Sequence, residues 1–360
     1  MINYRHHIGT PVRPSTRERK CVIRLTEESR GRNLTAKQKN LSLCMPNLTV
    51  MEIGEQIRRL SDLRKGDHAV ERLALCGERA IEPLREFLMN GAPSHIYQPR
   101  QRAVHALARL GAHEILLEYL MMPKNIPDPV IRFGEEAVEN TAARALAFWQ
   151  TEDVFTALLG IAYTRMLPGI IETLASFQRW EPIPLFIAAL MDDVSRTAAE
   201  NALKSMGEVA IPAVMEVISM PHSPNHCESP SALLRRRSAM HILAELKVGT
   251  GEWPKINGLL TDADPEIAVS AARIALKIAG PEETRAAIQT LIRKIPHVNW
   301  RTRTVIKTCL INHYGVAQKE IADQIAHAKL QSQDAQVCDR TLQLLLTVQK
   351  CVGVSATHAG

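Results

Sequence analysis

A five-residue phrase, A-x-x-A-L, recurs along this chain and constrains its fold more than any other feature. Residues at the first, fourth and fifth positions lie on one face of a helix, and the two small side chains let a neighbouring helix approach closely. Full copies begin at Ala103, Ala142, Ala199 and Ala272, and looser copies begin at Ile170, Ala239 and Ile306. The successive starting positions are 39, 28, 29, 40, 33 and 34 residues apart. Self-similarity at this period predicts an array of two-helix repeats.

A second phrase marks the point where one helix ends and the next begins. Gly77-Glu78-Arg79-Ala80-Ile81 returns as Gly207-Glu208-Val209-Ala210-Ile211, and Pro83 or Pro212 follows. Glycine adopts the positive φ that closes a helix, and proline is tolerated in the first turn of the next helix. Glycines at 111, 280 and 315 are interpreted in the same way. The predicted repeats begin near residues 77, 111, 150, 178, 207, 249, 280 and 315, after a helical pair over residues 49–76 that is expected to cap the array.

These patterns predict an all-α protein, a right-handed α-solenoid of about eight two-helix HEAT-like repeats. Only 4% of the residues are aromatic, which suits closely packed helices more than a β-sheet. We expect the solenoid to occupy residues 45–351, between a basic leader over residues 1–44 and a frayed tail over residues 352–360. The leader lacks helical or strand periodicity and has few large apolar residues, so it is predicted to be disordered. The alternative is that translation starts at Met45 or Met51.

The net charge of +6 is concentrated in this leader. Residues 1–44 contain ten Lys and Arg against three Glu, a net of +7, which leaves 34 basic and 35 acidic residues from Met45 onward. The repeats are therefore close to neutral, and the high pI says little about their partners.

The residues also limit the compartment and the chemistry. The seven cysteines are scattered and form no C-x-x-C pair, so neither a disulfide framework nor a thiolate metal site is predicted. No apolar run is long enough to span a bilayer, so we expect a cytoplasmic protein with no membrane partner. In the absence of G-x-S-x-G, H-E-x-x-H, Walker and Rossmann motifs, no catalytic residue, cofactor or metal is assigned. Two histidines and a cysteine within residues 221–227 are interpreted as part of a polar loop, because zinc needs a fourth ligand in a fixed geometry.

At its junctions and second helices the sequence resembles HEAT-like repeats of the phycobiliprotein lyase type. Gly77 to Leu84 matches the G-x-x-A-[IV]-x-P-L start of that family's first helix. Asp193 to Leu203 matches most of the D-x-x-[VI]-R-x-x-A-x-x-A-L pattern of its second helix, with the spacing of its first residues shifted. The resemblance covers about residues 50–350 and implies an array in which the second helices line the concave side. It does not specify one function, because this architecture hosts many.

We expect a non-catalytic scaffold that binds another protein through the concave face and one rim of the array. The longest connections within repeats, residues 90–99, 121–134 and 220–231, all fall on one rim. Two alternatives remain open: a nucleic-acid-binding protein, including one similar to alkylpurine glycosylases, and a chromophore lyase of the HEAT type. The first would use Arg235 to Arg237 with Arg301, Arg303 and Lys307 to contact phosphates, although solvated helix faces also explain these charges.

The candidate partner-binding residues follow from the register of the A-x-x-A-L phrase. Three of its five positions are predicted to face neighbouring helices, which leaves the second and third positions free. The third position carries hydrogen-bonding groups in five consecutive repeats, followed by Ile274 and Thr308. The predicted binding column is therefore His105, Arg144, Glu172, Asn201 and His241. Residues at the second position, Val104, Ala143, Ile171 and Met240, are expected to flank the column.

Overall fold

The computed structural model describes residues 49–219, 228–332 and 340–357, and throughout these ranges the regular structure is helical. The predicted all-α fold is therefore confirmed. The leader over residues 1–44 lies outside the described residues, and so do residues 220–227 with the two histidines and the cysteine noted above.

The helices follow one another with short connections. The α-helices are α3 (Val50–Arg59), α4 (Gly66–Leu75), α5 (Ile81–Asn90), α6 (Gln98–Arg109), α7 (His113–Met121), α8 (Pro129–Leu146), α9 (Glu152–Thr164), α10 (Pro168–Ser176), α11 (Ile183–Ala189), α12 (Arg196–Met206), α13 (Ile211–Ser219), α14 (Pro230–Glu245), α15 (Trp253–Ile256), α16 (Pro265–Ile278), α17 (Pro281–Lys294), α18 (Trp300–Asn312), α19 (Tyr314–Ser332) and α20 (Arg340–Thr357). The last of these continues to Thr357, whereas fraying was expected from residue 352. Among the helices of the described ranges, none has both the length and the apolar character needed to cross a membrane.

Three of the predicted junction glycines adopt the backbone conformation that the sequence suggested. Gly77, Gly111 and Gly207 have φ angles of 64°, 79° and 62°, a region that other residues occupy only at a cost. Two of them open short 3-10 turns, η1 (Gly77–Ala80) and η2 (Gly207–Ala210), which lead into α5 and α13. Gly280 differs, because its φ is −73° and it is the N-cap of α17.

The copies of the A-x-x-A-L phrase lie in seven consecutive even-numbered helices, α6 to α18. Their small and leucine positions are core residues: Ala103, Ala106 and Leu107 are all fully buried in α6. Each even-numbered helix from α4 to α18 packs against the next even-numbered helix, and several odd-numbered helices, such as α3, α5 and α7, pack in the same way. The small side chains of the phrase permit these close contacts.

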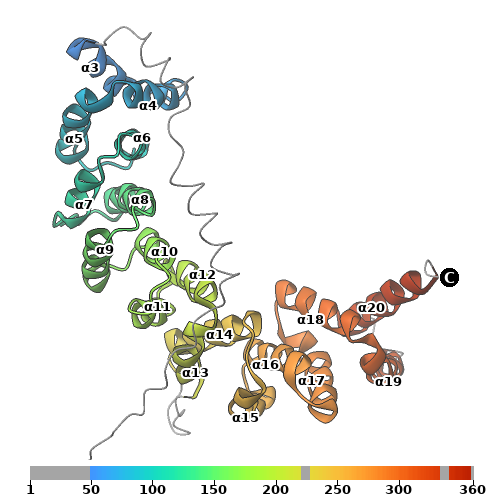
Figure 1. The fold of residues 1–360 in the computed structure, drawn as a ribbon. Helices are drawn as coiled ribbons and strands as arrows, with labels where there is room; N and C mark the ends of the chain where they lie inside the picture. Colours follow the sequence, from blue (N-terminus) through green and yellow to red (C-terminus); the bar gives the residue numbers. More distant parts are fainter. Residues whose placement is uncertain (1–48, 220–227, 333–339, 358–360) are drawn as a thin grey trace, which may run out of the picture.

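The helices are thereby arranged in two layers that run the length of the molecule (Figure 1). In this view the chain forms an elongated, bent array, with the even-numbered helices along the inner side of the bend. The buried apolar residues form a continuous core between the layers, from Ile53 in α3 to Val348 in α20. The inner layer is therefore built from successive even-numbered helices.

Candidate functional site

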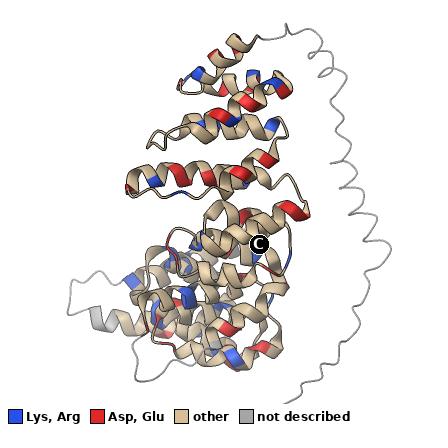
Figure 2. Ribbon diagram, turned by 90° about the vertical axis from the view of Figure 1, so that its left-hand side faces the viewer, with Lys and Arg blue, Asp and Glu red and all other residues tan. Residues whose placement is uncertain are grey.

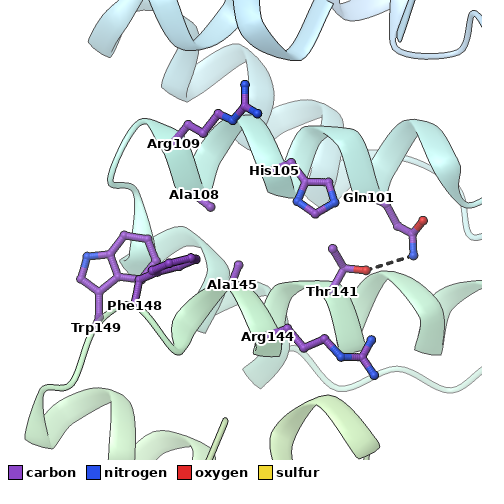
Figure 3. Close-up of a pocket in the computed structure, with 9 residues that line it drawn as sticks. All are labelled: Gln101, His105, Ala108, Arg109, Thr141, Arg144, Ala145, Phe148 and Trp149. Carbon is purple, nitrogen blue, oxygen red and sulfur yellow. Dashed lines mark hydrogen bonds between the residues drawn. The ribbon is translucent and has the colours of Figure 1, made fainter. Parts of the chain in front are cut away.

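A pocket of about 690 Å³ opens on the inner layer between α6 and α8. The two helices and the turn after α8 supply its walls, which are Gln101, His105, Ala108, Arg109, Thr141, Arg144, Ala145, Phe148 and Trp149. In Figure 3, His105 points from α6 toward α8, and the rings of Phe148 and Trp149 close one end of the pocket. Two of the predicted column residues, His105 and Arg144, are thus brought to one cavity.

At the aromatic end of the pocket, one ring packs against the protein and the other is exposed to solvent. Trp149 stacks on His113 of α7 with ring centroids 5.4 Å apart, and its other neighbour, Phe148, meets it edge-on at 6.4 Å. Trp149 is half-buried against the core, whereas Phe148 is 85% exposed. Because a large aromatic ring left in water forfeits the free energy of its burial, Phe148 is a feature that the fold itself does not explain.

Some polar groups of the pocket form hydrogen bonds with one another. Gln101 donates to the Thr141 hydroxyl at 3.0 Å and to the carbonyl of Ala137 at 3.1 Å, which ties α6 to α8. Desolvation at the pocket wall, with the charge of Arg109, lowers the pKa of His105, so its imidazole is neutral at pH 7 and can donate or accept a hydrogen bond. The pocket therefore offers an apolar end and a neutral hydrogen-bonding group beside it.

The five predicted column residues do lie on one layer, but they are not equivalent. Arg144 of α8 forms a salt bridge with Glu172 of α10 at 2.5 Å, so these two groups satisfy each other across neighbouring helices. Asn201 is exposed on α12, and His241 of α14 lines a second cavity. The column is therefore split between two cavities and an ion pair that joins α8 to α10.

The register of the phrase differs from the prediction at two points. Val104, Ala143, Ile171 and Met240 are all buried, so the second position is part of the core and does not flank a binding column. Ile274 is also buried, at 1% exposure, and Arg273 occupies the partly exposed position instead. In α16 the buried face is Ala271, Ala272, Ile274 and Ala275, one residue earlier than the A-x-x-A-L match implies.

The arginines that suggested a phosphate-binding track are largely engaged by the protein itself. Arg236 is buried and binds Glu228 at 3.0 Å and Asp262 at 2.6 Å, so it is not on a solvated face. Arg303 donates twice to the carbonyl of Val298, at 3.0 and 2.9 Å. Figure 2 shows Lys and Arg interspersed with Asp and Glu along the helices, and no continuous basic stripe is visible in this view.

A buried ionic network holds the rim where α5, α7 and α9 connect to the inner layer. Glu135 of α8 accepts hydrogen bonds from Arg100 and from the Tyr119 hydroxyl, and Lys124 lies 2.9 Å from it. Burial alone would raise the pKa of Glu135, but the hydrogen bonds from Arg100, Lys124 and Tyr119 hold it at about 2. The same lysine bridges to buried Glu139 at 2.9 Å.

This network fixes two of the three long rim connections. Gly134, next to Glu135, lies so close to the connection after α5 that a Cβ atom there would be 2.3 Å from the carbonyl oxygen of Ser94. Arg165, which follows α9, donates to Glu139 at 2.5 Å and to the carbonyl of Leu120 at 2.6 Å. The charged groups of the rim around α6 to α9 therefore connect these helices to one another.

Neither metal binding nor a known relative identifies the site. Among the described residues, no three His, Cys, Asp or Glu side chains are grouped so that they could hold a metal ion. Comparison with protein-family models gives no match, and comparison with curated proteins gives no significant match. The site residues predicted from the sequence did not include Phe148 or Trp149. The signal available was an aromatic pair one residue after the A-x-x-A-L phrase that ends α8.

Proposed function

We propose that the chain is a right-handed α-solenoid of about eight short HEAT-like repeats that binds another protein along the face of its even-numbered helices. Support for the repeat architecture comes from the A-x-x-A-L phrase in seven consecutive even-numbered helices and from packing between successive helices of one layer. Stacked repeats of this kind form extended surfaces, which suit a partner that is itself extended.

The observation that carries the proposal is the pocket between α6 and α8. Its volume of about 690 Å³ is within the range of binding sites for small groups and side chains. Ala108 and Ala145 leave room between the helices, and Phe148 offers an unburied aromatic face at the end. Aromatic residues beside arginine are typical of the positions that dominate protein interfaces. We infer that the pocket takes an apolar or aromatic side chain of the partner.

Two features favour a protein partner over nucleic acid. The chain from Met45 onward carries 34 basic and 35 acidic residues, so it lacks the positive field that drives binding to phosphate backbones. One of the two arginines of the pocket, Arg144, is neutralised by Glu172. A surface of mixed, paired charges around an apolar pocket is instead the usual composition of a protein interface.

The test compares two exposed phenylalanines of the same region. Phe148→Ala removes the aromatic end of the pocket, and Phe133→Ala removes a ring that is 66% exposed at the other end of α8, outside the pocket. Both variants should melt as the wild type does, because exposed side chains contribute little to stability. Each protein is used to isolate partners from native lysate, with and without nuclease treatment, and the captured proteins are quantified by mass spectrometry.

We expect at least one protein to be retained by the wild type and by Phe133→Ala, and to be lost with Phe148→Ala. A second variant, Ala108→Arg, fills the pocket from α6 and should lose the same protein. A set of captured proteins that is identical for all four chains would reject the pocket as the binding site. Capture that disappears on nuclease treatment would reject the protein partner in favour of nucleic acid.

A further inference from the structure

A second cavity, of about 480 Å³, lies on the same layer near the other end of the molecule. Four successive even-numbered helices line it, and each contributes one arginine: Arg196 from α12, Arg237 from α14, Arg273 from α16 and Arg301 from α18. The acidic residues in its wall are Glu200 and Glu266. The lining therefore holds four arginines against two glutamates, and three of the arginines also pair with Asp193, Asp264 and Glu245, which do not line the cavity.

Two of the arginines form hydrogen bonds with acidic residues that do not line the cavity. Arg237 binds Asp264 through its Nε and Nη2 atoms, with the Nε contact at 2.9 Å. Arg273 donates from Nη2 to Glu245 at 2.5 Å. These contacts fix the guanidinium planes and leave Nη1 of both, and Nε of Arg273, without a hydrogen-bond partner among the described residues. A guanidinium held in this way can bind an oxyanion without losing further side-chain entropy.

Arg301 differs from the other three. It is exposed, and within the described residues it forms no ion pair. Its Cζ atom lies 5.4 Å from the centre of the Trp300 ring, which is 69% exposed. An arginine at the mouth of this cavity can close over a bound anion, because nothing in the described chain competes for its five donors.

The remaining polar groups of the wall suit an oxyanion as well. Ser270 and Thr302 supply hydroxyl groups at α16 and α18. Each of the two glutamates accepts a hydrogen bond from a neutral donor, Glu200 from the Ser238 hydroxyl and Glu266 from the Asn299 amide, both at 2.6 Å. His241 completes the wall, and burial, followed by the charge of Lys204, lowers its pKa, so it is neutral at pH 7.

We propose that this cavity binds the phosphoryl group of a phosphorylated residue in an extended segment of a partner protein. A phosphoryl group presents three strong acceptor oxygens at pH 7, which match the donors that Arg237, Arg273 and Arg301 leave without a partner among the described residues. The inference rests on the proposed protein-binding function and names the chemistry of the partner. A nucleic-acid backbone fits less well, because it needs a positive field along many phosphates, whereas three of the four arginines are paired with acidic residues and the free donors converge on one cavity.

The test uses fluorescein-labelled peptides with degenerate flanks and a fixed central phosphoserine, and the same peptides with serine. Apparent affinity is measured by anisotropy with the full-length wild type, with Arg301→Ala and with Thr302→Glu. Thr302 is the third residue of α18, where a glutamate suits the helix N-terminus, so that variant should fold while adding a negative charge to the cavity. Arg285→Ala, at an exposed position of α17 in the other layer, is the matched control.

We expect the phosphorylated peptides to bind about 10-fold more tightly than the unphosphorylated ones, a difference that one or two charge-assisted hydrogen bonds supply. Arg301→Ala and Thr302→Glu should each remove most of this preference, and Arg285→Ala should keep it. Phe148→Ala should also keep it, since Phe148 lies outside this cavity. The experiment can therefore reject the phosphoryl site without rejecting the pocket between α6 and α8, and the reverse.

Equal binding of the two peptide sets by the wild type would overturn the phosphoryl site, and so would a preference that survives both Arg301→Ala and Thr302→Glu. A labelled oligothymidylate provides the third arm of the experiment. If it binds more tightly than the phosphorylated peptides and Arg301→Ala weakens it, the cavity belongs to a nucleic-acid surface and the proposal is wrong.

Discussion

At the scale of single residues, the buried glutamate Glu135 has the largest expected effect on stability. Its carboxylate accepts from Arg100 and Tyr119 and lies 2.9 Å from Lys124, and all of these groups are largely withdrawn from water. Removing one partner of a buried charged pair leaves the others without compensation, which costs about 3–5 kcal/mol. Glu135→Gln should therefore lower the free energy of unfolding in urea by about that amount.

The adjacent residue supplies the control for this prediction. Glu136 is only partly buried, and its distance of 3.9 Å from Arg132 marks a weak surface pair. Glu136→Gln should change the free energy of unfolding by about half a kcal/mol or less. Comparable losses in the two variants would show that the Glu135 network contributes no more than a surface pair does.

The same residue makes stability depend on pH in a defined direction. The folded-state pKa of Glu135 is about 2, below its unfolded value of about 4.3. A depressed pKa contributes stability that is fully present above the unfolded pKa and is lost as the pH falls through the folded pKa. Between pH 5 and pH 2, urea midpoints of the wild type should fall more steeply than those of Glu135→Gln. Parallel curves would mean that Glu135 does not titrate as described.

At the scale of helices, the close contacts of the inner layer predict which face tolerates substitution. Ala202 of α12 is 3% exposed, so Ala202→Arg would force a large charged group into a helix contact, at a cost of roughly several kcal/mol. The control must be an exposed residue of α12 without a structural contact, which excludes Arg196, because Arg196 donates to the carbonyl of Leu190 at 3.1 Å. Thr197 is exposed on the same helix, and Thr197→Ala should leave the urea midpoint nearly unchanged. Similar midpoints for both variants would place the buried face of α12 elsewhere.

The helix junctions give a second prediction at this scale. Gly207 has a φ of 62°, and a Cβ there would meet no atom within 4 Å, so the cost of Gly207→Ala comes from the backbone alone. That cost is about 1–3 kcal/mol, because a φ of 62° with a ψ of −132° is a conformation that residues with a side chain rarely adopt. Gly258 also has open space around its Cβ position but lacks a positive φ, so Gly258→Ala should be neutral or slightly stabilising. Thermal melts of the two variants measure the difference, and equal midpoints would argue against a left-handed junction at Gly207.

At the scale of the whole molecule, stability should depend on contacts between successive repeats. Deleting residues 1–44 should leave the melting temperature nearly unchanged, because that segment lacks the periodicity of a packed element. Deleting residues 1–76 also removes α3 and α4, which pack on α5 and α6 and accept hydrogen bonds from Arg102 at the carbonyls of Leu60 and Asp62. The longer deletion should lower the melting temperature by several degrees. A drop of that size after the shorter deletion would show that the leader packs on the array.

The sequence by itself determined the helical fold, the junctions at Gly77, Gly111 and Gly207, and the helices that form the inner layer. These features are local, because backbone conformation at a glycine and the spacing of small residues depend on residues within one or two turns. The phrase also identified His105, Arg144 and His241 as residues of that layer, since each follows two buried residues in the same register.

Only the tertiary structure decided how those residues are used. Arg144 and Glu172 are 28 positions apart and neutralise each other across two helices, and Arg236 is buried by Glu228 and Asp262. The one-residue shift that exchanges Ile274 for Arg273 depends on how α16 packs on its neighbours. Three features depend on distances between helices that are separate in the sequence. They are the pairing of charges, the closure of a cavity by Phe148 and Trp149, and the convergence of four arginines. Helical periodicity fixes the face on which a side chain lies, and only packing between helices fixes what that side chain meets.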